Sequence, residues 1–189
     1  MATVNLHPSS TVENAWDLEG SADTGTAHGN LSDSSDNSVL REPDQNSYCI
    51  VELDDFTESA DSITNIRWYV RATMILTRSS GSNTAIQVNL GDENHTSSSS
   101  SIYYSENVTV EFQAGYAQND YYGTARADVG DIGSSAWNDT SLNNLRLDIN
   151  TTPADPPGIS QIQMAKCYVE VTYTEAAVVD NAVFFGTNF

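Results

Sequence analysis

The sequence has very few cationic residues. Its 189 residues include seven Lys and Arg against 26 Asp and Glu, a formal net charge of −19, and Lys166 is the only lysine. Such an acidic surface repels phosphate backbones, so nucleic-acid binding is not expected. The carboxylates also repel one another at low ionic strength, whereas molar salt shortens the Debye length to about 3 Å and screens that repulsion. The charge pattern favours a protein that works in brine; acidity for solubility, or cation binding, is the alternative.

Long apolar runs are absent as well. No stretch approaches the roughly 20 apolar residues that span a bilayer. No cationic segment followed by an apolar run begins at Met1, where a secretory signal would lie. The sequence therefore predicts neither membrane insertion nor a cleaved signal peptide.

Catalytic and metal-binding signatures are missing too. The sequence contains no G-x-S-x-G turn, phosphate-binding loop or dinucleotide fingerprint. His7, His28 and His95 are too scattered for a zinc site, and we interpret them as solvated surface residues. We therefore expect no enzymatic activity, no catalytic residue, no cofactor and no metal site.

Three groups of acids admit two interpretations. They could bind calcium through their oxygen atoms, but none has the ligand spacing of an EF-hand, so solvated loop carboxylates are the favoured interpretation. The groups are Asp54 with Asp55, Asp33 with Asp36, and Asp128 with Asp131.

Alternation of apolar and polar residues is the strongest pattern present. Between Ile63 and Arg78, one face carries Ile66, Trp68, Val70, Ala72, Met74 and Leu76, and polar residues, Tyr69 and two arginines occupy the other. This period of two predicts a long strand with one buried side. Turn-forming residues 79–83 (SSGSN) and a second alternating segment, 84–90, follow. The two strands are therefore predicted to form a β-hairpin.

Shorter segments complete the expected fold. Further strands are predicted at 47–53, 108–112, 121–127, 145–149 and 162–173, with a loop at 91–101 and one helical turn at 138–144. The proline-rich segment 152–158 should interrupt pairing. Several strands joined by polar loops predict an all-β protein, an antiparallel β-sandwich resembling a jelly roll.

The two ends of the chain differ from this region. Residues 1–46 show no sustained period and are rich in Ser, Asp, Gly and Thr, so we expect an extended acidic N-terminal arm. Residues 47–175 should form the sandwich domain. Residues 176–189 form an apolar C-terminal tail that would favour aggregation if exposed. The tail is therefore expected to pack on the sandwich or on a neighbouring subunit.

The cysteines and tyrosines leave alternatives open. Cys49 and Cys167 form either a disulfide or two buried free thiols, and the missing secretory signal favours free thiols. The other group contains Tyr103, Tyr104, Tyr121 and Tyr122, with Tyr116. It forms either an exposed aromatic platform for sugars or proteins, or ordinary strand residues.

Several segments in a fixed order resemble a known group of proteins. They are Leu40–Leu53 (LREPDQNSYCIVEL), the two alternating segments within 66–90, Trp137 with Leu142, Leu145, Leu147 and Ile149, and Ile162–Tyr173. Together they resemble a small β-sandwich virion protein of tailed bacteriophages and tailed viruses of haloarchaea. The resemblance implies a structural component: a capsid decoration, turret, spike or tail-associated sandwich. The acidic composition departs from that pattern and fits a host that lives in brine.

These observations lead to one principal expectation and two rivals. The chain is expected to be a structural protein of the virion of a halophilic-host virus, assembled as a homo-oligomer and contacting the major capsid protein or other virion proteins. The alternative is a carbohydrate- or receptor-binding module of a tail fibre or cell surface, with host glycans as partners. A hydrolase built on a β-sandwich is the weakest of the three.

Overall fold

The computed structural model describes residues 1–20, 25–32, 35–36, 38–41, 47–76, 84–99, 101–111, 117–129, 135–151 and 160–177. Strands dominate these residues, and only two short helices occur among them. The elements are β1 (Ala2–Leu6), β2 (Pro8–Asn14), β3 (Asp17–Gly20), α1 (Ala27–Ser32), β4 (Ser38–Arg41), β5 (Tyr48–Leu53), β6 (Ala60–Leu76), β7 (Thr84–Gly91), β8 (Ile102–Val110), β9 (Asn119–Tyr122), α2 (Asp139–Asn143), β10 (Arg146–Thr151) and β11 (Ser160–Glu175). Neither helix is long and apolar enough to cross a membrane.

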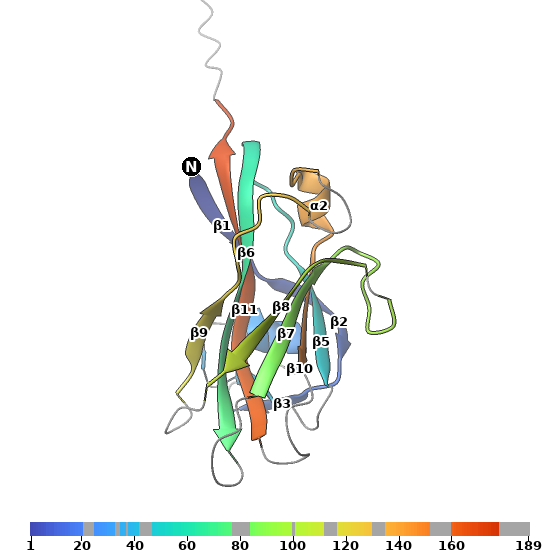
Figure 1. Ribbon diagram of the computed structural model, residues 1–189, viewed down its shortest axis with the longest axis vertical. Coiled ribbons are helices and arrows are strands. Elements are labelled where there is room, and N and C mark those ends of the chain that lie inside the picture. The colour runs from blue at the N-terminus through green and yellow to red at the C-terminus, as the bar shows by residue number, and fades with distance from the viewer. Residues whose placement is uncertain are drawn as a thin grey trace, which may run out of the picture.

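The strands form two antiparallel sheets. Sheet A has the order β3-β4-β11-β6-β9, and β1 also pairs with β11; sheet B has the order β2-β5-β10-β7-β8. Figure 1 shows the long strands β6 and β11 running side by side through sheet A. Most strands that are consecutive in the chain lie in opposite sheets. The structure therefore confirms the predicted all-β antiparallel sandwich, and the repeated crossing between sheets gives it its jelly-roll character.

The core lies between the sheets and follows the predicted period of two. Each large apolar side chain removed from water contributes about 1.5–3 kcal/mol to folding. The alternating apolar face of β6 is buried as expected, and it meets the inward faces of β7 and β10. The buried apolar residues on these inward faces include Ile66, Trp68, Val70, Ala72, Met74, Ile86, Val88, Leu90, Leu147 and Ile149.

The predicted β6–β7 hairpin is wrong. β6 pairs with β11 and β9 in sheet A, whereas β7 pairs with β10 and β8 in sheet B. Two neighbouring strands with one apolar face each can bury those faces against each other by entering opposite layers, which a hairpin does not allow. The connecting residues 77–83 lie outside the described residues.

The predicted N-terminal arm is also wrong for the described residues. β1 pairs with β11, β2 with β5, and β4 with β11, so the first 41 residues contribute strands to both sheets. Leu6, Trp16, Leu31 and Leu40 enter the same core as the central strands. These strands are four to seven residues long, too short to show a period, and ladder hydrogen bonds with a few apolar anchors suffice to hold them. The predicted tail lies outside the described residues from residue 178 onward.

Other boundaries agree more closely. The predicted helical turn at 138–144 is α2, and the predicted loop at 91–101 separates β7 from β8. β8 begins at Ile102, earlier than expected, and the irregular strand near 121–127 is the short β9. The segment 152–158 lies outside the described residues.

The carboxylate of Glu106 joins the two sheets where β8 of sheet B lies near β9 of sheet A. Oε2 of Glu106 in β8 accepts hydrogen bonds from Trp68 Nε1 (2.8 Å) and the Thr124 amide (3.0 Å), and Oε1 accepts one from Arg126 Nη2 (2.8 Å). Burial alone would raise the pKa of Glu106, but these hydrogen bonds outweigh it and lower the pKa. Gly123 permits the close approach, because a Cβ there would lie 2.3 Å from Trp68 Nε1.

Candidate functional site

The loop between β7 and β8 folds back over the outer face of sheet B. Asp92 begins the turn: Oδ1 accepts a hydrogen bond from the Asn94 amide (2.8 Å), and Oδ2 accepts one from the Ser101 hydroxyl (2.7 Å). Gly91 has no side chain, and a Cβ at this position would lie 2.5 Å from the Cβ of His95. The turn and the glycine together direct His95 onto the sheet.

His95 completes a buried cluster of polar side chains. Oδ2 of Asp148 in β10 accepts hydrogen bonds from His95 Nε2 (2.9 Å), Asn89 Nδ2 (2.9 Å) and Asn150 Nδ2 (2.8 Å). Only 3% of His95 and 2% of Asp148 is exposed. Arg146 holds the loop above them, since its Nη1 donates to the His95 carbonyl (2.8 Å). Three donors on one oxygen compensate the carboxylate for its loss of water.

A pocket of about 330 Å³ opens beside this cluster. Its lining is largely polar and, among the described residues, includes no Lys or Arg: Tyr48, Gln87, Asn89, His95, Thr96, Ser97, Ser98, Ser99, Ile102, Asp148 and Asn150. The loop reaches across sheet B to β2, where the Ser97 amide donates to Glu13 Oε2 (3.0 Å). Hydrogen bonds from Ser97 lower the pKa of Glu13 and keep its carboxylate charged.

Three buried atoms of this cluster lack a hydrogen-bond partner within the described part of the chain. They are Asn89 Oδ1, His95 Nδ1 and Asp148 Oδ1. Buried polar atoms are normally satisfied, and an unsatisfied one costs about 1–3 kcal/mol. The amide and carboxylate oxygens are acceptors, and no Lys or Arg lines the pocket in the described part of the chain. These three atoms have almost no surface open to the pocket, so it is the polar lining that suits a small uncharged ligand and disfavours an anion.

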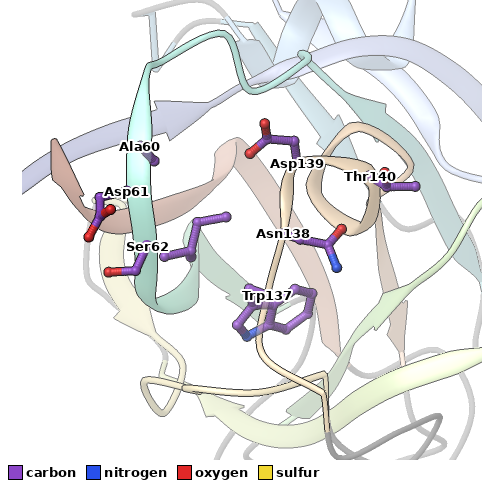
Figure 2. Close-up of a pocket in the computed structure, with 8 residues that line it drawn as sticks. Ala60, Asp61, Ser62, Trp137, Asn138, Asp139 and Thr140 are labelled. Carbon is purple, nitrogen blue, oxygen red and sulfur yellow. The ribbon is translucent and has the colours of Figure 1, made fainter. Parts of the chain in front are cut away.

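A second pocket, of about 360 Å³, lies where β6 begins and the chain enters α2. Figure 2 shows Ala60, Asp61 and Ser62 on one side, Asn138, Asp139 and Thr140 on the other, and Trp137 below them. Oδ1 of Asn138 accepts a hydrogen bond from the Ser141 amide (3.0 Å), and Ser141 Oγ accepts one from the Asn138 amide (3.0 Å). This capping box fixes the start of α2 beside the pocket.

The four tyrosines do not form the exposed aromatic platform that was one of the two alternatives. Tyr103 is buried against Trp137, with ring centroids 5.3 Å apart, and Tyr104 donates a hydrogen bond to Asp128. Both belong to β8 in sheet B, whereas Tyr121 and Tyr122 belong to β9 in sheet A. The platform interpretation is therefore wrong for these four residues. Tyr116 lies outside the described residues.

A different tyrosine cluster, which the sequence analysis missed, lies on the outer face of sheet A. Tyr122 of β9, Tyr69 of β6 and Tyr168 of β11 are directly opposite one another across three strands. Ring centroids are 5.1 Å apart between Tyr69 and Tyr122, and 4.2 Å apart in the stacked pair Tyr69–Tyr168. Tyr69 occupied a polar position of the predicted strand, which was a usable signal. Its two partners could be found only from the strand pairing.

The histidines differ from the solvated residues that were predicted. The prediction is wrong for His95, whose side chain is buried. The turn at Asp92 places the imidazole ring between the loop and sheet B. His7 is half-buried beside Tyr168, and burial lowers its pKa. His28 is also half-buried, and its Nδ1 lies 3.0 Å from the Thr11 hydroxyl oxygen.

The acidic groups and cysteines have simple surroundings. Asp54, Asp55 and Asp128 are exposed, and Asp36 forms an ion pair with Arg71. Asp33 and Asp131 lie outside the described residues, among which no group of three or more His, Cys, Asp or Glu could hold a metal ion. Cys49 and Cys167 are buried free thiols, which confirms the favoured alternative, and burial raises the pKa of each thiol.

Comparisons with known proteins reveal only distant similarity. No family model matches the chain, and no curated protein matches it. A glycoside hydrolase family 43 arabinoxylan arabinofuranohydrolase from Bacillus subtilis, in complex with cellotetraose, aligns over 93% of this chain with 11% identity and a TM-score of 0.45. The chain spans 27% of that protein's length. The K1 cleaved adhesin domain of Lys-gingipain from Porphyromonas gingivalis W83 aligns over 92% of this chain and 99% of its own, with 10% identity and a TM-score of 0.41.

Proposed function

We propose that the chain is a structural component of the virus particle of a halophilic host, a capsid decoration, turret or spike protein that assembles as a homo-oligomer. The observation that carries the proposal is that β1 begins and β11 ends at the same end of the sandwich. Ala2 pairs with Tyr173, and Ala60 pairs with Glu175, so both strand ends lie at one pole of the sandwich. Figure 1 shows this end, with the N-terminus, the tip of β11 and α2 close together. We call it the terminal pole.

An anchor at the terminal pole would leave the rest of the sandwich projecting from a particle. The sequence after Glu175 is apolar at Ala176–Val179, Ala182–Phe185 and Phe189. An apolar segment beside an acidic domain is suited to burial in a neighbouring virion protein. β6 and β11, of 17 and 16 residues, give the sandwich a continuous axis that starts at this pole.

The distribution of ion pairs supports a role in brine. Within the described residues, five carboxylates have an arginine nitrogen within 4.0 Å: Glu19, Asp36, Glu106, Asp120 and Glu170. The described residues include 19 of the 26 acidic residues of the chain, so repulsion among carboxylates exceeds attraction in dilute buffer. Molar salt removes much of that repulsion.

Incorporation into particles tests the proposal. One variant lacks residues 178–189, and a matched variant keeps their number but replaces the apolar ones by Ser and Asn. We expect both variants to fold and to enter particles about tenfold less than the unaltered chain, as loss of a central apolar anchor predicts. Full incorporation of both variants, or absence of the unaltered chain from particles, would contradict the proposal.

The second candidate is a carbohydrate- or receptor-binding module, favoured by the polar pocket over sheet B. Its lining of amide and hydroxyl side chains matches the hydroxyl groups of a neutral sugar. A panel of neutral glycans, screened by NMR in molar NaCl, tests this candidate. Shifts confined to pocket amides and lost in Asn150→Ala would support it, and a panel without a binder would remove it.

A further inference from the structure

Cationic residues are concentrated on the outer face of sheet A. Six of the seven cationic residues lie in the described part of the chain, and four of them are on strands of this sheet: Arg41, Arg67, Arg71 and Lys166. Glu19, Asp36, Asp120 and Glu170 lie among them and pair with the three arginines. Asp17 of β3, directly opposite Arg41, also lies on this face, so the rest of the chain holds 21 acidic and three cationic residues. This face is therefore close to neutral in a protein that is otherwise strongly anionic.

The tyrosine row lies between two rows of charges on this face. On one side Arg71 is directly opposite Asp120 of β9 and Lys166 of β11. On the other side Arg67 is opposite Glu170 and binds it through Nε (2.6 Å). Tyr122 is 50% exposed, although the Arg67 guanidinium lies 4.8 Å from its ring centroid. Exposed tyrosine flanked by fixed arginines is typical of protein interfaces.

Most polar side chains of this face already form hydrogen bonds or ion pairs with one another. Arg71 donates to Asp36 Oδ1 and Oδ2 and to Asp120 Oδ1, each at 2.7 Å, and Tyr69 donates to the same Asp120 oxygen at 2.7 Å. Lys166 forms no ion pair within 4.0 Å in the described part of the chain. A sugar needs unused donors and acceptors, so this surface suits the flat face of a protein better.

We infer that this face binds the same face of a second copy of the chain. The inference rests on the proposed homo-oligomer and assigns its contact surface. A two-fold axis along β6 would lay β9 of each copy over β11 of the other. Tyr122 of one copy then meets Tyr168 of the second, and Asp120 meets Lys166. Residues of β6 meet their own copies on this axis, where Asp36 and Asp120 neutralise each Arg71. Two chains of charge −19 can approach most closely where their charges balance.

Sedimentation velocity of the full chain in molar NaCl tests the inference. The unaltered chain should sediment as a dimer, and Tyr122→Ser should raise the dimer dissociation constant about tenfold or more. Lys166→Glu, which sets like charges opposite each other, should weaken association as well. Tyr48→Ser, on the outer face of sheet B, is the matched control and should leave association unchanged.

The outcomes separate this inference from the proposed function. A monomeric unaltered chain, or an undiminished Tyr122→Ser dimer, overturns the interface. A monomer that instead binds a glycan through Tyr122 also overturns it. Incorporation into particles depends on the terminal pole and not on sheet A, so the tail variants report on the virion role independently. Circular dichroism of each variant shows that it is folded.

Discussion

The two outer faces of the sandwich use polar residues in opposite ways. On sheet B, His95 of the β7–β8 loop covers Asp148, and only 4% and 3% of their side chains are exposed. On sheet A, Asp36 and Asp120 pair with Arg71 and remain 49% and 45% exposed. A buried carboxylate matters through the donors that it satisfies, while a surface ion pair is screened and contributes little. The fold should therefore depend on the polar face of sheet B, and association on that of sheet A.

Asp148→Ala should have the largest effect on stability. It leaves His95, Asn89 and Asn150 without their shared acceptor, so we expect the free energy of unfolding to fall by about 3 kcal/mol. Chemical denaturation in constant molar NaCl measures the change. Asp54→Ala, at an exposed carboxylate, is the control and should change stability little. If both substitutions changed the free energy of unfolding by the same small amount, the fold would not depend on the polar face of sheet B.

Glu106→Ala should have an intermediate effect on stability, because the Glu106 carboxylate joins β8 of sheet B to Trp68 of sheet A and to Arg126. Removing the acceptor of Trp68 and Arg126 should cost about 2 kcal/mol. The pKa of Glu106 is lowered in the folded state, so its contribution is present above the unfolded value of about 4.3 and is lost as pH falls through the folded pKa. Unfolding curves at neutral and acid pH measure both effects. A variant as stable as the unaltered chain at neutral pH would show that Glu106 does not join the sheets.

Arg71→Gln should have the smallest effect on stability. Its ion pairs are half-exposed, so the loss should be about 0.5 kcal/mol in dilute buffer and less in molar NaCl. The hydrogen bond from Arg71 lowers the pKa of Asp36, and that pKa should rise toward the ordinary value in the variant. NMR titration of the Asp36 carboxyl measures the shift. A loss as large as that of Asp148→Ala would mean that the sheet A face also supports the fold.

Long strands with one buried side could be predicted from the sequence, whereas their partners could not. Burial of one face imposes alternation on β6, β7, β10 and β11, and that signal is local. Whether β7 lies beside β6 or across from it depends on the packing of the whole sandwich. The short strands β1 to β4 carry too few residues for a period to appear.

The candidate sites could be predicted only in part for the same reason. His95 and Asp148 are 53 positions apart, and their contact exists only because the loop after Gly91 folds over β10. The tyrosine row likewise combines β6, β9 and β11, which pairing alone brings together. Composition did indicate the acidic surface, because net charge does not depend on the fold.

Electron cryomicroscopy of particles from a halophilic culture that produces the chain tests the central claim most directly. The account predicts copies of the sandwich on the particle surface, with the terminal pole toward the shell and the sheet A faces of paired copies in contact. Particles that carry no copy of the chain, or copies attached by the opposite end of the sandwich, would contradict it.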